Sequence, residues 1–301
     1  MRPHRAASAA RTSSRSTTTD DTRRAVGDIG DRGHGERGGY GAEVTETSPE
    51  PPVFYRLDAG VAHLELNRPD AFNALSVELA EALAEAVGRA AADDEVKVLL
   101  LSGRGRAFCG GGDVKQMAAV EDTSAMVHEL AQAAHRGVLA LAELDKPVIG
   151  AVHGSVAGGG LGLTCSVDLL LAGESTKFVA AYGGIAVTPD CSVTWGLPRI
   201  IGERRALQLL LRNQVVTAHT AEEWGLVTEV VPDAEILESG RALAASIAAD
   251  PAAAALGRTR RLVREAGGRS LPDQLDAEAA AIAHFAGRPE AASLIQRFAA
   301  R

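Results

Sequence analysis

The sequence is poor in the residues that would support several common types of fold. Its 301 residues include three cysteines, Cys109, Cys165 and Cys191, and no two of them have CxxC spacing. An odd number of widely separated cysteines argues against a disulfide framework and against a zinc knuckle, and it fits a reducing cytoplasm. No apolar run approaches the ~20 residues that a membrane-spanning helix needs.

Positive charge is also scarce. Asp and Glu number 39 against 31 Lys and Arg, which gives a net charge of −8, and only four of the basic residues are lysines. A surface that binds nucleic acid or an anionic membrane needs clustered positive charge. We therefore expect neither partner for this chain.

The usual nucleotide motifs are missing, although two glycine clusters are present at 109–113 and 157–161. Neither cluster is followed by the Lys-Ser/Thr pair of a P-loop, and the second does not complete GxGxxG. Ser155 has His153 and Ala157 at the two positions where the G-x-S-x-G nucleophile elbow has glycine. The glycines alone leave two interpretations open: tight turns, or backbone N–H groups that hold an oxyanion.

The chain divides into three parts by composition. Residues 1–50 are rich in Arg, Ser, Thr, Gly and Asp without apolar periodicity, which predicts a disordered N-terminal extension. Over 51–233, expected strands (61–66, 96–101, 147–152, 168–172) alternate with expected helices (77–91, 126–144), so this core is predicted to be α/β. Residues 234–301 are predicted to be helical, with breaks at 250–251, 267–268 and 287–289.

An ordered set of short motifs gives the glycine clusters a context. The chain contains NRPDAFNAL (67–75), AFCGGGD (107–113), KPVIGAVHG (146–154), AGGG (157–160), WGLV (224–227) and VVP (230–232). In this order and spacing they resemble the crotonase (enoyl-CoA hydratase/isomerase) family. The resemblance implies a spiral of ββα units with a C-terminal helical trimerisation region, and hence a homotrimer or hexamer. It also implies an acyl-CoA thioester substrate, with no metal and no separate cofactor because coenzyme A is part of the substrate.

The resemblance assigns roles to particular positions. The N–H groups of Gly112 and Gly159 match the pair that holds the thioester oxygen as it becomes an enolate, and such donors typically contribute a few kcal/mol each. Two segments match those that hold coenzyme A, mostly through backbone groups. They comprise Asp70, Ala71, Asn73 and Ala74 in the first segment and Asp113, Val114 and Lys115 in the second.

The acid–base positions favour isomerisation over hydration. Gly162 and Tyr182 stand where family hydratases have their two glutamates, so the paired carboxylates that hold a water are missing. Asp190 matches the single carboxylate base of several family isomerases. The resemblance therefore predicts an enoyl-CoA isomerase. Because a carboxylate is a stronger base in an apolar pocket, we expect Ile185, Val187 and Trp195 to form apolar walls around Asp190.

Other functions remain open. Residues 157–163 together with Asp190 also resemble 4-chlorobenzoyl-CoA dehalogenase. In that enzyme the aspartate is a nucleophile, a histidine activates water and a tryptophan positions the aspartate. His135 falls at the histidine position, and Tyr182 replaces the tryptophan. A thioester hydrolase and a non-catalytic acyl-CoA-binding protein are further alternatives.

Several remaining residues have simpler interpretations. We expect Cys109 and Cys191 to be small packing residues, and His153 and Asp168 to be structural. The arginines at 258, 260 and 261 are predicted to form a solvated helical face, with contact to the phosphates of coenzyme A as the alternative.

Overall fold

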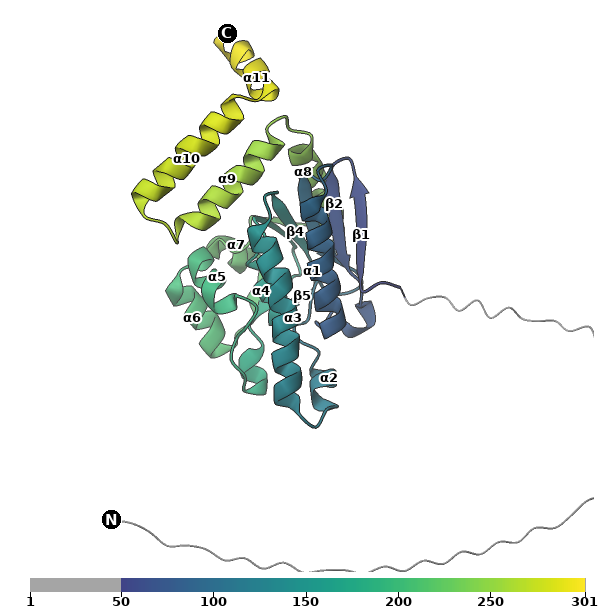
Figure 1. The fold of residues 1–301 in the computed structure, drawn as a ribbon. Coiled ribbons are helices and arrows are strands. Elements are labelled where there is room, and N and C mark those ends of the chain that lie inside the picture. The colour runs from purple at the N-terminus through teal and green to yellow at the C-terminus, as the bar shows by residue number, and fades with distance from the viewer. Residues whose placement is uncertain (1–49, 301) are drawn as a thin grey trace, which may run out of the picture. The chain divides into compact units, whose positions relative to one another are not determined.

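The structure, a computed structural model, describes residues 50–300. The predicted extension over 1–50 therefore lies outside the described residues, apart from Glu50. The main sheet has six strands in the order β1-β2-β3-β4-β6-β9 (Figure 1). Their bounds are Val53–Asp58, Val61–Leu66, Val98–Gly103, Val148–Val152, Leu169–Gly173 and Glu229–Val231. The first pair is antiparallel and all later neighbours are parallel, so the prediction of an α/β core is confirmed.

Both faces of the main sheet are buried, and strand β3 shows how the sequence achieves this. Leu99 and Leu101 point into the larger core with helices α1 (Val77–Ala92) and α3 (Thr123–Glu143), whereas Val98 and Leu100 point into the smaller core with α8 (Ile236–Ala248). Successive side chains of a strand alternate between faces, so a continuous apolar run is what a strand covered on both sides requires.

A second, three-stranded sheet follows the order β5-β7-β8. Strand β5 (Ser155–Ala157) is parallel to β7 (Lys177–Val179), and β8 (Val216–Thr217) is antiparallel to β7. The remaining helices before β9 are short. They are η1 (Pro69–Ala71), α2 (Val114–Ala118), α4 (Gly159–Thr164), η2 (Tyr182–Ile185), α5 (Val193–Ile201), α6 (Glu203–Arg212) and α7 (Ala218–Trp224).

The chain after β9 is helical, as its sequence predicts. Helices α9 (Ala253–Ala266), α10 (Leu271–Ala286) and α11 (Pro289–Ala299) follow α8 and are separated at the three expected breaks (Figure 1). Within residues 50–300, no helix combines the length and the apolar character needed to cross a bilayer.

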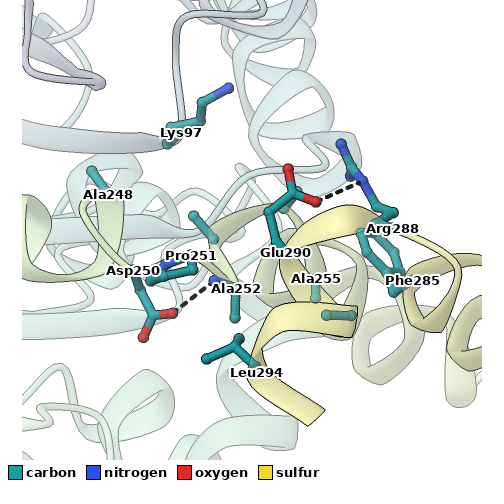
Figure 2. A pocket seen from close by; sticks show the side chains of 13 residues that line it. Lys97, Ala248, Asp250, Pro251, Ala252, Ala255, Phe285, Arg288, Glu290 and Leu294 are labelled. Atoms are coloured by element: carbon teal, nitrogen blue, oxygen red, sulfur yellow. Dashed lines mark hydrogen bonds and ion pairs between the residues drawn. The ribbon is translucent and has the colours of Figure 1, made fainter. Parts of the chain in front are cut away.

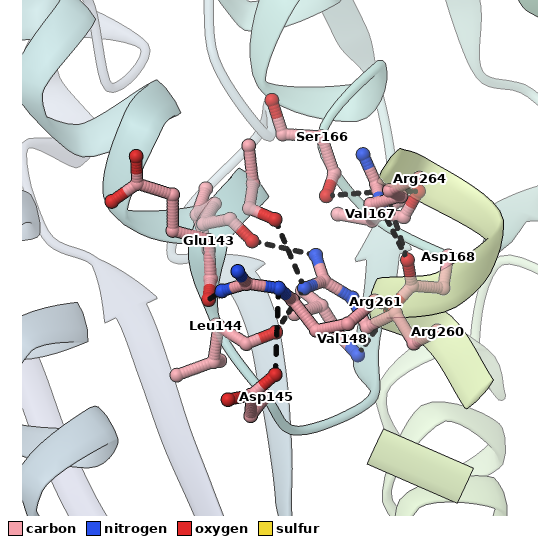
Figure 3. Close-up of polar contacts among 12 residues, drawn as sticks. Glu143, Leu144, Asp145, Val148, Ser166, Val167, Asp168, Arg260, Arg261 and Arg264 are labelled. Carbon is pink, nitrogen blue, oxygen red and sulfur yellow. Dashed lines mark hydrogen bonds and ion pairs between the residues drawn. The ribbon is translucent and has the colours of Figure 1, made fainter. Parts of the chain in front are cut away.

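One part of helix α9 differs from the prediction of a solvated arginine face. Arg260 is buried, and its Nε donates a 2.6 Å hydrogen bond to Asp168 Oδ2, which also accepts from the backbone N–H of Val148 at 2.7 Å (Figure 3). The guanidinium further donates to the carbonyl oxygens of Leu141, Ala142 and Leu144 at the end of α3. A cation is favoured there because a helix C-terminus carries partial negative charge and unpaired carbonyls.

Arg264 completes this network by donating to Asp168 Oδ1 at 2.8 Å (Figure 3). Arg261 instead pairs with Glu265, with its NH2 group 2.5 Å from Oε1. Arg260 and Arg264 therefore fasten α9 to the core. Asp168 has the structural position that the sequence led us to expect.

Candidate active site

The two glycine clusters lie against each other. Cys109 donates a backbone hydrogen bond to Ser155 O at 3.2 Å, and Ala157 donates one to Cys109 O at 3.0 Å. A Cβ atom on Gly160 would lie 2.5 Å from Cys109 O. Only glycine permits so close an approach of two backbones. The glycines of the two clusters therefore allow the loops to pack against each other, in addition to forming turns.

The backbone N–H groups of Gly112 and Gly159 take no part in the hydrogen bonds that join these loops to the neighbouring segments. Leu75 donates to Gly111 O at 2.7 Å and accepts from Asp113 N–H at 3.0 Å, so the bridge uses the groups on either side of Gly112. Gly159 is the first residue of α4, where N–H groups have no acceptor within the helix. Gly111 and Gly158 allow this arrangement with φ values of +100° and +49°.

The segments expected to hold coenzyme A form a rigid loop. The side chain of Asn73 is fully buried, accepts from Arg68 N–H at 2.7 Å and donates to Arg104 O and Ala107 O. Asp113 caps α2 by accepting from Gln116 N–H and forms a 2.9 Å ion pair with Arg68. Burial alone would raise the pKa of Asp113, but the hydrogen bond from Arg68, the backbone N–H groups of Gln116 and Lys115 and the charge of Arg68 together outweigh it and hold that pKa below its ordinary value.

The side chains of Asn73 and Asp113 are thus committed to the loop itself. The other predicted positions are more open: Asp70, Val114 and Lys115 are exposed, and Ala71 and Ala74 are half-buried. Arg68 joins both segments through its contacts with Asn73 and Asp113. Sequence reasoning did not single it out as a functional residue, and its place in the NRPD stretch was the only available signal.

The segment that carries Asp190 has a strained backbone. Ala181, Ala186, Cys191 and Ser192 all have positive φ, from +49° to +67°. Each costs roughly 1–3 kcal/mol for a residue with a Cβ atom, and such residues collect where the surrounding structure fixes a functional loop. Asn213 helps by accepting a 2.7 Å hydrogen bond from Ala181 N–H.

Four side chains meet at the end of this segment. Tyr182 Oη donates a 2.7 Å hydrogen bond to Asp190 Oδ1, and the backbone N–H of Cys191 donates to His135 Nε2 of helix α3 at 3.2 Å. Burial and then the negative charge of Asp190 raise the pKa of the Tyr182 hydroxyl, so the phenol stays a donor. The same two causes raise the pKa of the Cys191 thiol.

These residues adjoin the glycine loops. A Cβ atom on Gly159 would lie 3.4 Å from Cys191 Sγ, and one on Gly158 would lie 3.9 Å from the Tyr182 ring. The predicted site residues Gly112, Gly159, His135, Tyr182 and Asp190 therefore belong to one region. Cys191 belongs there too, and its position next to Asp190 in the sequence was the only signal for it.

The hydratase position is closed. A Cβ atom on Gly162 would clash with Cys191 O and would lie 2.6 Å from Cys191 Cβ, so this backbone has no room for a side chain. The three apolar residues that were expected to enclose Asp190 do not do so, because they are largely exposed. Ile185, Val187 and Trp195 are 47, 43 and 55 % exposed. They lie on the outside of the strained segment and of α5.

The other cysteines and His153 behave as packing residues. Burial raises the pKa of Cys109 and of Cys165 to about 12, so neither is a thiolate near neutral pH. His153 Nε2 lies 2.9 Å from Gly105 O, which holds the ring to a neighbouring loop. None of the three has a geometry that calls for a catalytic role.

A separate pocket lies among the C-terminal helices and the turn that precedes α9 (Figure 2). Its lining includes Lys97 before β3 and Leu294 of α11, and Glu290 points toward Arg288 with 3.9 Å between the charged atoms. Lys97 lies just before the start of β3, whereas the first glycine loop follows the end of that strand. The pocket is therefore not part of the candidate active site.

Comparison with known proteins agrees with this geometry. The enoyl-CoA hydratase/isomerase family model matches residues 56–300. The chain is 36% identical over 230 residues to 1,2-epoxyphenylacetyl-CoA isomerase of Escherichia coli, covering 75% of this chain and 87% of that protein. It is 30% identical over 241 residues to 4-chlorobenzoyl coenzyme A dehalogenase-2 of an Arthrobacter species, covering 79% and 87%. A solved enoyl-CoA hydratase of Mycobacterium smegmatis has a TM-score of 0.75 at 31% identity, covering 83% of this chain and 96% of that one.

Proposed function

The chain belongs to the enoyl-CoA hydratase/isomerase (crotonase) family, and we propose that within it the protein is an enoyl-CoA isomerase with Asp190 as its single base. The observation that carries the proposal is the position of Asp190. It lies beside the two glycine loops, and its carboxylate is held by Tyr182. A relative that is 36% identical and named as an isomerase supports the same reaction class.

In the proposed reaction, a 3-enoyl-CoA binds with its thioester oxygen between the N–H groups of Gly112 and Gly159. Asp190 removes a proton from carbon 2, and the electron pair moves onto the thioester oxygen to form a dienolate. The two N–H donors stabilise that developing charge. The protonated Asp190 then returns the proton to carbon 4, which leaves the conjugated 2-enoyl-CoA with no net loss of atoms.

Hydration is disfavoured by the space around Gly162. A hydratase needs a second carboxylate to share the attacking water, and a side chain at this position would clash with Cys191. Tyr182 stands at the other carboxylate position, and it donates a hydrogen bond to Asp190.

Dehalogenation is the second candidate, favoured by the position of His135 near Asp190 and by the Arthrobacter relatives. In that reaction Asp190 attacks the halogen-bearing ring carbon and halide leaves. His135 then activates the water that hydrolyses the resulting aryl ester.

A substrate comparison tests the proposal. The purified protein is given 3-enoyl-CoA, 2-enoyl-CoA and 4-chlorobenzoyl-CoA in parallel. Isomerisation of 3-enoyl-CoA is followed by the rise in ultraviolet absorbance as the conjugated thioester forms. Hydration of 2-enoyl-CoA is followed by the fall in the same absorbance, and dehalogenation is followed by the chloride released. We expect turnover of 3-enoyl-CoA alone. Chloride release would favour the second candidate, and binding of all three thioesters without turnover would mean that the protein is not an enzyme of this class.

We also propose self-association through the C-terminal helices, as a homotrimer or hexamer. Helices α10 and α11 expose large apolar side chains, which are Leu271, Leu275, Ile282, Ile295 and Phe298. Exposed apolar side chains that gather into a patch mark interaction sites, and we propose that these five do so. Light scattering coupled to size exclusion would give the mass directly, and a monomer at micromolar concentration would contradict the proposal.

A further inference from the structure

We infer that His135, Asp190 and Cys191 form a binding site for a divalent cation of the zinc class. These residues come from helix α3 and from the strained segment before α5. The imidazole nitrogen, carboxylate oxygen and thiol sulfur all lie within 4.8 Å of one another. Within residues 50–300, this is the one group of three or more His, Cys, Asp or Glu side chains with such spacing.

The separations suit a small adjustment to tetrahedral coordination. Zinc bonds of 2.0–2.3 Å to N, O and S ligands place the ligand atoms roughly 3.3–3.7 Å apart. The cluster therefore needs a contraction of about 1–1.5 Å from its widest spacing, which side-chain rotation at half-buried His135 and Asp190 can supply. Three protein ligands leave a fourth position for water, as in zinc sites that are not closed.

The histidine presents the nitrogen that a metal needs. Because His135 Nε2 accepts a hydrogen bond from the backbone N–H of Cys191, that nitrogen carries the lone pair and its direction is toward the cluster. On binding, the metal replaces this N–H as the partner of Nε2. The thiol of Cys191 gives its proton to solvent as the sulfur–metal bond forms.

A second layer of contacts orients the carboxylate. Tyr182 Oη donates to Asp190 Oδ1 at 2.7 Å, which fixes the carboxylate plane and leaves its second oxygen for the metal. Ligating carboxylates and histidines generally have such outer partners. The mixed nitrogen, oxygen and sulfur donors select a zinc-like ion over Mg²⁺ or Ca²⁺, which prefer oxygen ligands alone.

The site overlaps the proposed base, so occupancy has a consequence. A metal held by Asp190 withdraws the carboxylate from proton transfer, and we expect Zn²⁺ to inhibit the enzyme. This consequence rests on the proposed function, whereas the binding site does not. Direct metal binding therefore tests the inference separately from catalysis.

The experiment measures binding of Zn²⁺ to the full chain by competition with a chromophoric chelator in a thiol-free reducing buffer. The same samples are titrated with Co²⁺, whose thiolate complexes absorb in the near ultraviolet. The variants are Cys191→Ser and His135→Gln, with circular dichroism to check folding. The matched controls are Cys165→Ser, at a buried cysteine outside the cluster, and His128→Gln, at an exposed histidine of the same helix.

We expect one Zn²⁺ per chain, a cobalt–thiolate band, and at least about 100-fold weaker binding in both cluster variants, beyond the loss typical of an outer partner. The two controls should bind as the wild type does. Wild-type affinity in either cluster variant, or a Co²⁺ complex without the thiolate band, would overturn the inference. Isomerase activity, present or absent, would not change that result.

Discussion

Tyr182 Oη donates a 2.7 Å hydrogen bond to Asp190 Oδ1, and the two residues are separated by a segment with left-handed backbone at Ala186. A hydroxyl in this position fixes the orientation of the carboxylate, and in the proposed reaction the other carboxylate oxygen takes the proton from the substrate.

Replacing this hydroxyl should lower turnover more than substrate binding. A hydrogen bond to a charged group contributes about 1.5–3 kcal/mol, so Tyr182→Phe should reduce kcat about 10- to 100-fold with little change in KM. Steady-state kinetics on 3-enoyl-CoA measure both constants. Tyr55→Phe is the matched control. The Tyr55 hydroxyl is buried and has no hydrogen-bond partner among residues 50–300, so its removal breaks no hydrogen bond there. An unchanged kcat in Tyr182→Phe would refute the positioning role.

Adding a side chain at the closed hydratase position should destabilise the protein. Gly162→Ala places a Cβ atom against Cys191, and overpacking of this kind costs about 1–3 kcal/mol. Gly88→Ala is the control, since a Cβ atom there has nothing within 4 Å in the middle of helix α1 and should stabilise by about 0.5–1 kcal/mol. Denaturant unfolding compares the two. Equal effects from both substitutions would show that the space around Gly162 is not restricted.

The buried end of α3 depends on one arginine. Arg260→Met leaves Asp168 paired with Arg264, but it removes the donor to the carbonyl oxygens of Leu141, Ala142 and Leu144. Because a buried acceptor without a donor costs about 1–3 kcal/mol, the variant should lower the free energy of unfolding by at least that amount. Arg258→Met, on a more open part of the same helix, should change it by less than about 1 kcal/mol. Similar unfolding midpoints for the two variants would indicate a solvated face after all.

A buried histidine should make stability fall in mild acid. Burial, followed by the charges of Arg241 and Arg56, lowers the pKa of His63 from 6.5 to about 4, and its Nε2 lies 2.7 Å from Ser102 Oγ. Between those pKa values the unfolded chain binds a proton that the folded chain does not. Stability is therefore complete above about pH 6.5 and decreases toward pH 4 by up to about 3 kcal/mol.

Unfolding of His63→Gln over the same pH range isolates this contribution. The variant should have a shallower slope than the wild type, and His128→Gln should keep the wild-type slope. Parallel curves for His63→Gln and the wild type would exclude His63 as the source.

Much of the fold could be predicted from local patterns. Buried strands such as β3 are continuous apolar runs, and the breaks between the C-terminal helices coincide with Gly and Pro residues. The approach of the two glycine loops followed from the resemblance; the first loop follows β3 of the main sheet and the second follows β5 of the smaller sheet. These features are set by residues that are close together in the sequence, so they can be predicted without knowing which distant segments come into contact.

The contacts between distant segments could not be predicted. Arg260 was expected in solvent, and nothing near it in the sequence indicates that the last carbonyls of α3, 116 to 119 residues earlier, lie within reach. The contact of His135 with Cys191 likewise joins residues 56 apart and depends on positive φ at Cys191 and Ser192, which are ordinary residues in the sequence. Trp195 was expected to be a wall, but its exposure depends on which face of α5 packs inward.

The central claim is that one carboxylate moves the proton. The direct measurement is the rate at which 3-enoyl-CoA becomes 2-enoyl-CoA for the wild type, for Asp190→Asn, and for Asp276→Asn on an exposed part of α10 as the control. We expect Asp190→Asn to lose about 100- to 10,000-fold in kcat, as removal of a general base typically does, and Asp276→Asn to retain the wild-type rate. Turnover by Asp190→Asn at the wild-type rate would contradict the account.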